Sequence, residues 1–255
     1  MQNRSLFAIL LFFVATMFAC LPVGWAAKLS TLKIVPSYME IDMFFSGREV
    51  SLSGLIPHDR DIILEVIGPE QKSKFNMKGK VGPFWMTREK IELEHAPFLY
   101  KLLLPGDNKW HDMLSQLGIG ITTLKKKLIL KPENMSIDMI FNRFVRLKRS
   151  ENLYGEEEDA IHYSRGTEGR KHFETRFSFP SSTVPGEYRI VAKVLHDGKI
   201  EETKIQSFEV EEVGLIKKVH DIAFRNGLVY GILCVFIALF FGGVIGLIFK
   251  RVEAH

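Results

Sequence analysis

The chain has 255 residues, a net charge of +4, and ordinary fractions of hydrophobic (46%) and charged (25%) residues. A net charge this small disfavours nucleic-acid binding, which normally rests on a concentrated basic face. The two cysteines, Cys20 and Cys234, lie in two strongly apolar ends of the chain. Disulfide bonds, thiolate metal sites and cysteine catalysis are therefore excluded from the region between those ends.

The N-terminal end has the pattern of an export signal. A basic start precedes an apolar run over residues 6–19, which is shorter than the about 20 residues that span a bilayer. Small residues follow this run, so we expect a signal peptide over residues 1–26, cleaved after Ala26 or Ala27. A lipoprotein signal ending at Cys20 is the alternative, and the bulky residue before this site disfavours it.

Residues 27–106 have the alternation and the turn signals of β-strands. Apolar and polar side chains alternate over Glu49–Ile56, and Ile62–Ile67 is a compact apolar run. Phe75–Met86 contains single glycines and a Gly-Pro turn, which favours two short strands there. Phe98–Leu104 is a further strand candidate. We assign this region to the first part of a β-sandwich.

Residues 107–169 change to a helical period. Asp107 can cap one helix that ends near Gly118, and Glu133–Arg149 predicts a second helix with one apolar stripe. The polar face of the second helix carries Arg143, Arg146, Lys148 and Arg149. The acidic run Glu156–Asp159 is expected to be a solvated loop. We interpret the whole region as a helical insertion.

Residues 170–212 return to alternating strands, with a hairpin turn at Asp197-Gly198. The segment Val184–Tyr188 resembles the start of strand F in immunoglobulin-like domains, where a tyrosine bonds back to the corner. The predicted fold is therefore mainly β: an immunoglobulin-like β-sandwich ectodomain with an α-helical insertion, plus one C-terminal transmembrane helix. Two lobes joined by a helical linker are the alternative.

The C-terminal end contains 23 uncharged residues, 227–249, which at 1.5 Å per residue can cross a hydrocarbon core of about 30 Å. A juxtamembrane segment, 213–226, precedes this span, and a short tail, 250–255, follows it. Lys250 and Arg251 begin the tail, and the positive-inside rule places such residues in the cytoplasm. We expect a single-pass protein of the inner (cytoplasmic) membrane, with its ectodomain in the periplasm and its C-terminus in the cytoplasm.

Several short segments carry a family resemblance: Phe45–Gly47, Val50–Gly54, Asp61–Pro69, Gly82–Trp85, Arg146–Lys148, Leu153-Tyr154, Val184–Tyr188 and Tyr230-Gly231. In this order, over nearly the whole chain, they resemble an uncharacterised bacterial family of alphaproteobacterial transmembrane proteins. The resemblance implies an exported ectodomain with one C-terminal span and no established activity. It also implies association with polytopic permeases of the sulfite-exporter type, and hence a transport accessory role.

The chain lacks the sequence signatures of common active sites. Its eight histidines are scattered, without the spacings typical of zinc ligands, and no nucleophile elbow occurs. His58, beside Asp59 and Asp61, is interpreted as part of a polar turn. We therefore expect no enzymatic activity, no cofactor and no metal site.

Six residues are candidates for interactions: Trp85, Arg143, Arg146, Arg149, Gly242 and Gly246. The tryptophan is a loop aromatic that can anchor a partner or pack beneath its turn. The arginines can dock an acidic partner, and the glycine pair permits close packing between membrane helices. The sequence thus favours an anchored periplasmic accessory protein that assists a membrane permease. An extracytoplasmic module that binds or senses a small anion is the alternative.

Overall fold

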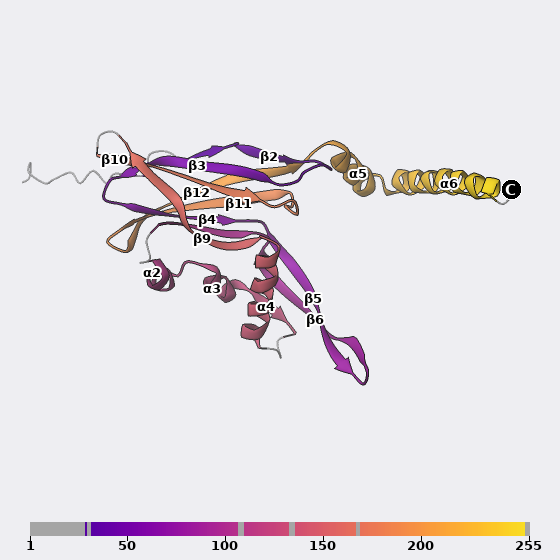
Figure 1. The fold of residues 1–255 in the computed structure, drawn as a ribbon, viewed down its shortest axis with the longest axis horizontal. Coiled ribbons are helices and arrows are strands. Elements are labelled where there is room, and N and C mark those ends of the chain that lie inside the picture. Colours follow the sequence, from indigo (N-terminus) through magenta and orange to yellow (C-terminus); the bar gives the residue numbers. More distant parts are fainter. Residues whose placement is uncertain (1–28, 30–31, 107–109, 133–135, 167–168, 253–255) are drawn as a thin grey trace, which may run out of the picture.

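The computed structural model describes residue 29 and residues 32–106, 110–132, 136–166 and 169–252, so the predicted signal peptide lies outside the described residues. Strands dominate, and helices occur in the middle of the chain and after the last strand (Figure 1). The elements in chain order are β1 (Leu32–Val35), β2 (Tyr38–Ile41), β3 (Arg48–Pro57), β4 (Asp61–Ile67), β5 (Glu70–Val81), β6 (Phe84–Pro97), β7 (Tyr100–Pro105), α2 (Trp110–Leu117), α3 (Ile121–Leu124), η1 (Lys125–Lys127), β8 (Ile129–Lys131), α4 (Ile137–Ser150), β9 (Tyr154–Arg165), β10 (Arg170–Phe179), β11 (Gly186–His196), β12 (Lys199–Glu212), α5 (Gly214–Arg225) and α6 (Gly227–Val252).

Nine strands form two layers that close into a sandwich. One layer has the order β1-β3-β10-β9 and the other β7-β4-β11-β12-β2. Only Pro36 and Ser37 separate β1 from β2, yet β1 pairs with β3 while β2 runs parallel to β12. The first described strands therefore belong to the outer edges of both layers. This arrangement is that of an immunoglobulin-like sandwich, which confirms the predicted fold class.

Strand β9 connects the two layers. Its first residues pair in parallel with β7, with Tyr154 opposite Tyr100, and its last residues pair with β10, with Ile161 opposite Thr175. Between these two pairings Asp159 adopts a φ of 55° and the register shifts. The solvated loop expected at Glu156–Asp159 is therefore wrong, because these acidic residues belong to a strand that changes its partner.

A tyrosine corner closes the turn before β11. The buried Tyr188 donates its hydroxyl to the carbonyl oxygen of Val184 at 2.9 Å. The tyrosine ring packs edge-on against Phe179 at 5.1 Å, and that ring stacks on Phe208 at 5.6 Å. The corner predicted from the sequence is confirmed, and it lies against the aromatic part of the sandwich core.

Two insertions lie outside the sandwich. β5 and β6 form a long hairpin that, with β8, makes a separate three-stranded sheet. α2, α3 and α4 lie along one side of the sandwich, with α4 beside the hairpin (Figure 1). The hairpin strands have 12 and 14 residues, so the prediction of two short strands in Phe75–Met86 is wrong in length. A register shift at Met77/Lys78 accommodates the irregular sequence within one continuous ladder, and the turn lies at Gly82-Pro83 as expected.

The two ends of the sandwich differ in the segments that connect to their strands. β4 and β12 are both antiparallel to β11, so they run in the same direction. The hairpin follows β4 and α5 follows β12, so both leave from one end, which we call the α5 end. The β3–β4, β9–β10 and β11–β12 turns lie at the opposite end, the far end.

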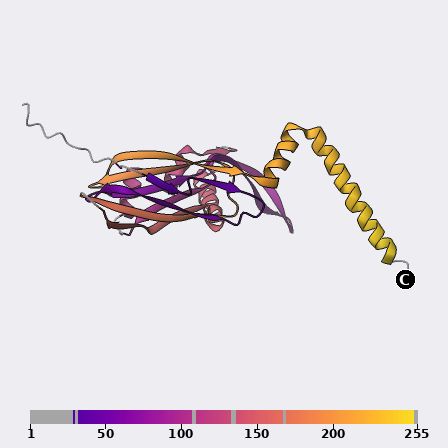
Figure 2. The same cartoon turned by 90° about the horizontal axis from the view of Figure 1, so that it is seen from above.

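Helix α6 continues from α5 and extends away from the sandwich (Figure 2). Its segment Gly227–Gly246 has a mean hydropathy of 2.7, and the side chains of this segment are exposed. A continuous apolar surface of this length is unstable in water and matches the thickness of a bilayer. α6 is therefore the transmembrane helix that the sequence predicts.

Candidate functional site

An apolar groove lies between the hairpin and α4, and we call it the hairpin groove. It has a volume of about 180 Å³. Its floor is formed by the buried side chains of Ile91, Ile140 and Phe144. The described residues that line it are Phe75, Asn76, Met77, Ile91, Ile140, Arg143, Phe144 and Leu147.

The groove exists because the apolar stripe of α4 is wider than the surface that covers it. Ile140, Phe144 and Leu147 recur at spacings of four and three residues and so share one side of the helix. Ile140 and Phe144 are 5% and 2% exposed, whereas Leu147 is 41% exposed. The hairpin therefore covers one part of the stripe and leaves the Leu147 edge open.

A row of aromatic rings attaches the groove to the sandwich. Phe75 of the hairpin meets Phe144 edge-to-face at 5.7 Å, and Phe144 meets Tyr154 of β9 at 5.5 Å. Tyr154 in turn lies 6.2 Å from Tyr100 of β7, also edge-to-face. Such contacts stabilise beyond the burial of their area. The rings fix α4 between the hairpin and the sheet.

The root of the hairpin is held tightly. The Gly68 N–H donates to the Leu99 carbonyl at 2.8 Å, and the Phe98 N–H donates to the Pro69 carbonyl at 2.8 Å. A Cβ at position 68 would lie 2.9 Å from the Leu99 nitrogen and 3.0 Å from the Tyr188 ring. Only glycine allows this close approach, so the packing at Gly68 sets where the hairpin leaves the sandwich.

Among the described residues that line the groove, Arg143 is the charged one. Its Nη1 lies 3.9 Å from the Met77 sulfur, a weak acceptor, and within the described part of the chain no carboxylate pairs with it. A guanidinium at the rim of an apolar groove is suited to a carboxylate on an otherwise apolar ligand.

A buried polar cluster lies between the row of rings and the sheet. The Tyr100 hydroxyl donates to Glu65 Oε1 at 2.6 Å and accepts from the Gly120 N–H at 3.1 Å, and Lys193 also binds Glu65. Burial, reinforced by the Glu65 carboxylate, raises the pKa of Tyr100 far above its ordinary value. Because each of these polar groups already has a hydrogen-bond partner, the cluster holds the start of α3 on the sheet and offers no free group to a ligand.

The remaining basic residues of α4 do not join Arg143. Arg146 and Arg149 line a second hollow on the other side of the helix, and Arg149 pairs with Glu156 at 3.1 Å. Lys148, expected on the polar face, is instead buried, with its ammonium 5.1 Å from the centre of the Phe98 ring. Burial lowers the pKa of Lys148 below its ordinary value. The predicted basic residues therefore do not form one face, because they lie on different sides of α4.

The other candidates lie elsewhere. Trp85 belongs to β6 beside the hairpin turn, away from the groove residues. Gly242 and Gly246 lie one turn apart in α6, and apart from the backbone of α6 itself no atom of the described residues lies within 4 Å of a Cβ built at either position. The glycine pair is therefore open to a second membrane helix.

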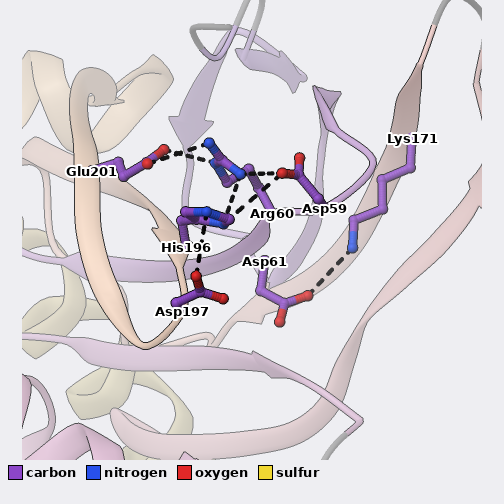
Figure 3. Close-up of polar contacts among 7 residues, drawn as sticks. All are labelled: Asp59, Arg60, Asp61, Lys171, His196, Asp197 and Glu201. Carbon is purple, nitrogen blue, oxygen red and sulfur yellow. Dashed lines mark hydrogen bonds and ion pairs between the residues drawn. The ribbon is translucent and has the colours of Figure 1, made fainter. Parts of the chain in front are cut away.

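A cluster of ion pairs at the far end was not predicted from the sequence (Figure 3). Arg60 of the β3–β4 turn binds Glu201 of β12 through Nε at 2.7 Å and Nη2 at 3.3 Å. The same guanidinium contacts Asp59, and its Nη1 lies 2.6 Å from His196 Nδ1. The sequence shows these residues only as polar turn residues, because the turns meet only in the folded chain.

The cluster extends along the same end of the sandwich. His196 Nε2 lies 3.4 Å from Asp197, and Lys171 of β10 lies 3.3 Å from Asp61 and over the Tyr163 ring (Figure 3). Its charges are matched partly within one turn and partly by residues from other segments. We interpret the cluster as a clasp that holds the far-end turns together. No group of three or more potential metal-binding side chains occurs among the residues that the structure describes.

A search of curated proteins finds no match to the chain. A family model, in contrast, matches residues 31–251, which include the sandwich, both insertions and most of α6. The match therefore covers the groove, the clasp and the span alike. The chain belongs to the family described as "Putative transmembrane protein (Alph_Pro_TM)", a family of membrane proteins, in agreement with its resemblance in sequence and its single apolar helix.

Proposed function

We propose that the protein is a non-enzymatic accessory protein that binds a membrane partner through the hairpin groove. The observation that carries the proposal is the open Leu147 edge of the groove, an apolar surface whose rim carries Arg143, an arginine that pairs with no carboxylate among the residues the structure describes. Arginine stays protonated and is a poor acid or base, so this lining is suited to binding and not to proton transfer.

The chemistry of the groove defines the partner segment. Phe75, Met77 and Leu147 provide an apolar, adaptable rim, and Arg143 adds one positive charge. An amphipathic helix or strand with one or two apolar anchors and an adjacent Asp or Glu fits both features. The groove belongs to the half of the ectodomain from which α5 and α6 leave, so an extramembrane segment of an integral membrane protein is well placed to reach it.

The proposed partner is a polytopic permease of the cytoplasmic membrane. In this proposal the ectodomain of the present chain lies on the periplasmic side, and its C-terminus lies in the cytoplasm. Gly242 and Gly246 support the same class of partner, because they leave one side of α6 open to a close helix contact. An anion-binding module is less well supported, because Arg143 and Arg146 lie in different hollows and do not converge on one site.

The test is site-specific photocrosslinking in intact cells, followed by mass spectrometry of the crosslinked peptides. A photoreactive residue at Leu147 should capture a segment of a polytopic membrane protein that carries apolar residues beside an Asp or Glu. The matched control is Asn142, which is exposed on the other side of the same helix. The charge-reversing change Arg143→Glu should abolish the crosslink from Leu147.

Two outcomes would overturn the proposal. Equal capture from Leu147 and Asn142 would mean that the groove has no special role. Capture that survives Arg143→Glu unchanged would show that the arginine does not recognise the partner.

A further inference from the structure

The hairpin changes in character along its length. Near its root, Lys72 pairs with Glu94 at 3.0 Å and Lys74 pairs with Glu92 at 3.1 Å. Residues 78–88, which we call the hairpin tip, contain three basic residues and no acidic residue. A segment that carries basic residues and no acidic one favours an anionic surface as its partner. The basic residues of the tip are Lys78, Lys80 and Arg88.

The tip also exposes large apolar side chains. Phe84 is 69% exposed and Met86 is 54% exposed, and both follow directly after the Gly82-Pro83 turn. In sequence, Trp85 lies between them. Exposed aromatic residues flanked by lysine and arginine are typical of segments that enter the headgroup region of a bilayer.

The direction of the strands places this tip on the membrane side of the ectodomain. β4 and β12 run the same way, so the hairpin and the chain leading to α6 leave from the same end. Twelve extended residues of β5 reach about 40 Å. In the two views, which share their horizontal axis, the hairpin extends along the molecule as far as α5 (Figures 1 and 2).

Helix α5 marks the position of the bilayer surface. It directly precedes the span, and it has the exposed apolar residues Leu215 and Val219 on one side and Lys217 and Lys218 on others. An amphipathic helix joined to a transmembrane helix lies at the interface between lipid and water. The hairpin tip is therefore long enough and correctly directed to reach the same interface.

We propose that the hairpin tip binds the anionic surface of the bilayer that α6 spans. Phe84 and Met86 enter the headgroup region, and Lys80 and Arg88 bind lipid phosphates. The ectodomain is then held at two separate points, α5–α6 and the hairpin tip. A single anchor leaves a domain free to swing, whereas two contacts fix its orientation and the direction in which the hairpin groove faces.

The test uses the purified full chain in bilayers of neutral lipid, or of neutral lipid with about 30% phosphatidylglycerol, which gives the bilayer a negative surface potential. Cys20 and Cys234 are replaced by Ser, and an environment-sensitive fluorophore is attached at Thr87→Cys, an exposed tip position that keeps Phe84 and Met86. The matched control is a label at Lys199→Cys, an exposed position at the far end. Fluorescence lifetimes and quenching by headgroup-labelled lipid report lipid contact.

We expect lipid contact at Thr87 and none at Lys199, with greater contact in anionic bilayers. The double variant Lys80→Gln/Arg88→Gln should lower the ratio of bound to detached tip by about 30-fold, because two basic residues near an anionic surface are lost. Phe84→Ser should reduce lipid contact in both kinds of bilayer. Circular dichroism and thermal unfolding of each variant check that the ectodomain stays folded.

Three results would overturn the proposal. If the Thr87 label is quenched no more than the Lys199 label, the tip does not touch the bilayer. If quenching is the same in neutral and anionic bilayers, or is unchanged in the Lys80/Arg88 variant, the basic residues do not bind lipid phosphates.

Discussion

The two ends of the sandwich use charged residues in opposite ways. At the far end, Arg60 and Lys171 bind the carboxylates of Glu201 and Asp61 from neighbouring segments, and His196 contacts Asp197 of its own turn, so the charges of the clasp are matched within it. At the α5 end, Arg143 lies beside an open apolar groove and the hairpin tip is basic without an acidic residue. The comparison indicates that the far end is built for stability, and that the end nearest the membrane is built for contact.

The length of the connecting segments explains how one sandwich has paired charges at one end and basic residues open to other surfaces at the other. Two connections at the far end are short: Asp197-Gly198 joins β11 to β12, and three residues join β3 to β4. Short turns hold their side chains close enough to pair. At the α5 end the chain between β4 and β7 is extended into the hairpin, so its residues leave the sandwich and meet other surfaces.

The largest expected change in stability is at the α5 end, and it tests whether the groove elements can lose structure while the sandwich stays folded. Phe144→Ala removes a buried ring that contacts Phe75 and Tyr154, and should destabilise the fold by about 3–5 kcal/mol. Hydrogen exchange should show lost protection in α4 and the hairpin while the sandwich strands keep theirs. Uniform loss across the ectodomain would contradict the separation of the two ends.

The next effect is at the far end and tests whether the clasp stabilises the fold. Arg60→Met leaves Glu201 and Asp59 without their shared guanidinium, and should cost about 1–2 kcal/mol in the free energy of unfolding. Glu201→Gln and the double variant complete a cycle with a coupling of about 1 kcal/mol. A coupling near zero would mean that this ion pair is solvated and does not stabilise the fold. Partner crosslinking from Leu147 should be unchanged in all three variants.

A smaller effect is expected at the tyrosine corner, which supports the hairpin root. Tyr188→Phe removes one hydrogen bond, to Val184, and should cost about 1 kcal/mol. Burial raises the pKa of Tyr188 above its ordinary value of 10.0. The unfolded tyrosine therefore loses its proton first, so stability is retained below pH 10 and falls as the pH rises above it. Denaturant unfolding at pH 8 and pH 11 should show a smaller loss in the variant than in the parent protein.

The smallest effect on stability is expected at Leu147, and it sharpens the contrast with Phe144 on the same helix. Leu147→Ala should change the free energy of unfolding by less than about 0.5 kcal/mol, because the side chain is 41% exposed. It should nevertheless weaken capture of the partner by a photoreactive residue placed at Met77 on the facing strand. Unweakened capture with unchanged stability would remove Leu147 from the binding surface.

The sequence predicts features that depend on neighbouring residues. The corner at Val184–Tyr188, the hairpin turn at Asp197-Gly198 and the apolar stripe of α4 each arise from local patterns, and the structure contains all three. The transmembrane helix is predicted for the same reason, because length and hydropathy alone define it.

Other features depend on contacts between distant residues. Glu156–Asp159 has the composition of a loop, yet β7 and β10 supply the partners that make it a strand. Lys148 lies on the predicted polar face, but it is buried, with its ammonium over the rings of Phe98 and Phe144. The clasp joins turns 136 residues apart in sequence, as in the contact of Arg60 with His196, and no local pattern indicates such a contact. The hairpin groove likewise forms only where β5 and α4, which are far apart in sequence, lie side by side in the folded chain.

The parallel pairing of β2 with β12 has a mechanical consequence. β12 leads directly into α5, and four residues of β2, Tyr38–Ile41, pair with its last four residues, Glu209–Glu212. The Val213 N–H also donates to the Ile41 carbonyl at 2.9 Å. A force that pulls on the membrane anchor acts along β12, so it loads these parallel hydrogen bonds in shear, together rather than one after another. The sandwich can thus resist tension transmitted from α6 before its strands separate.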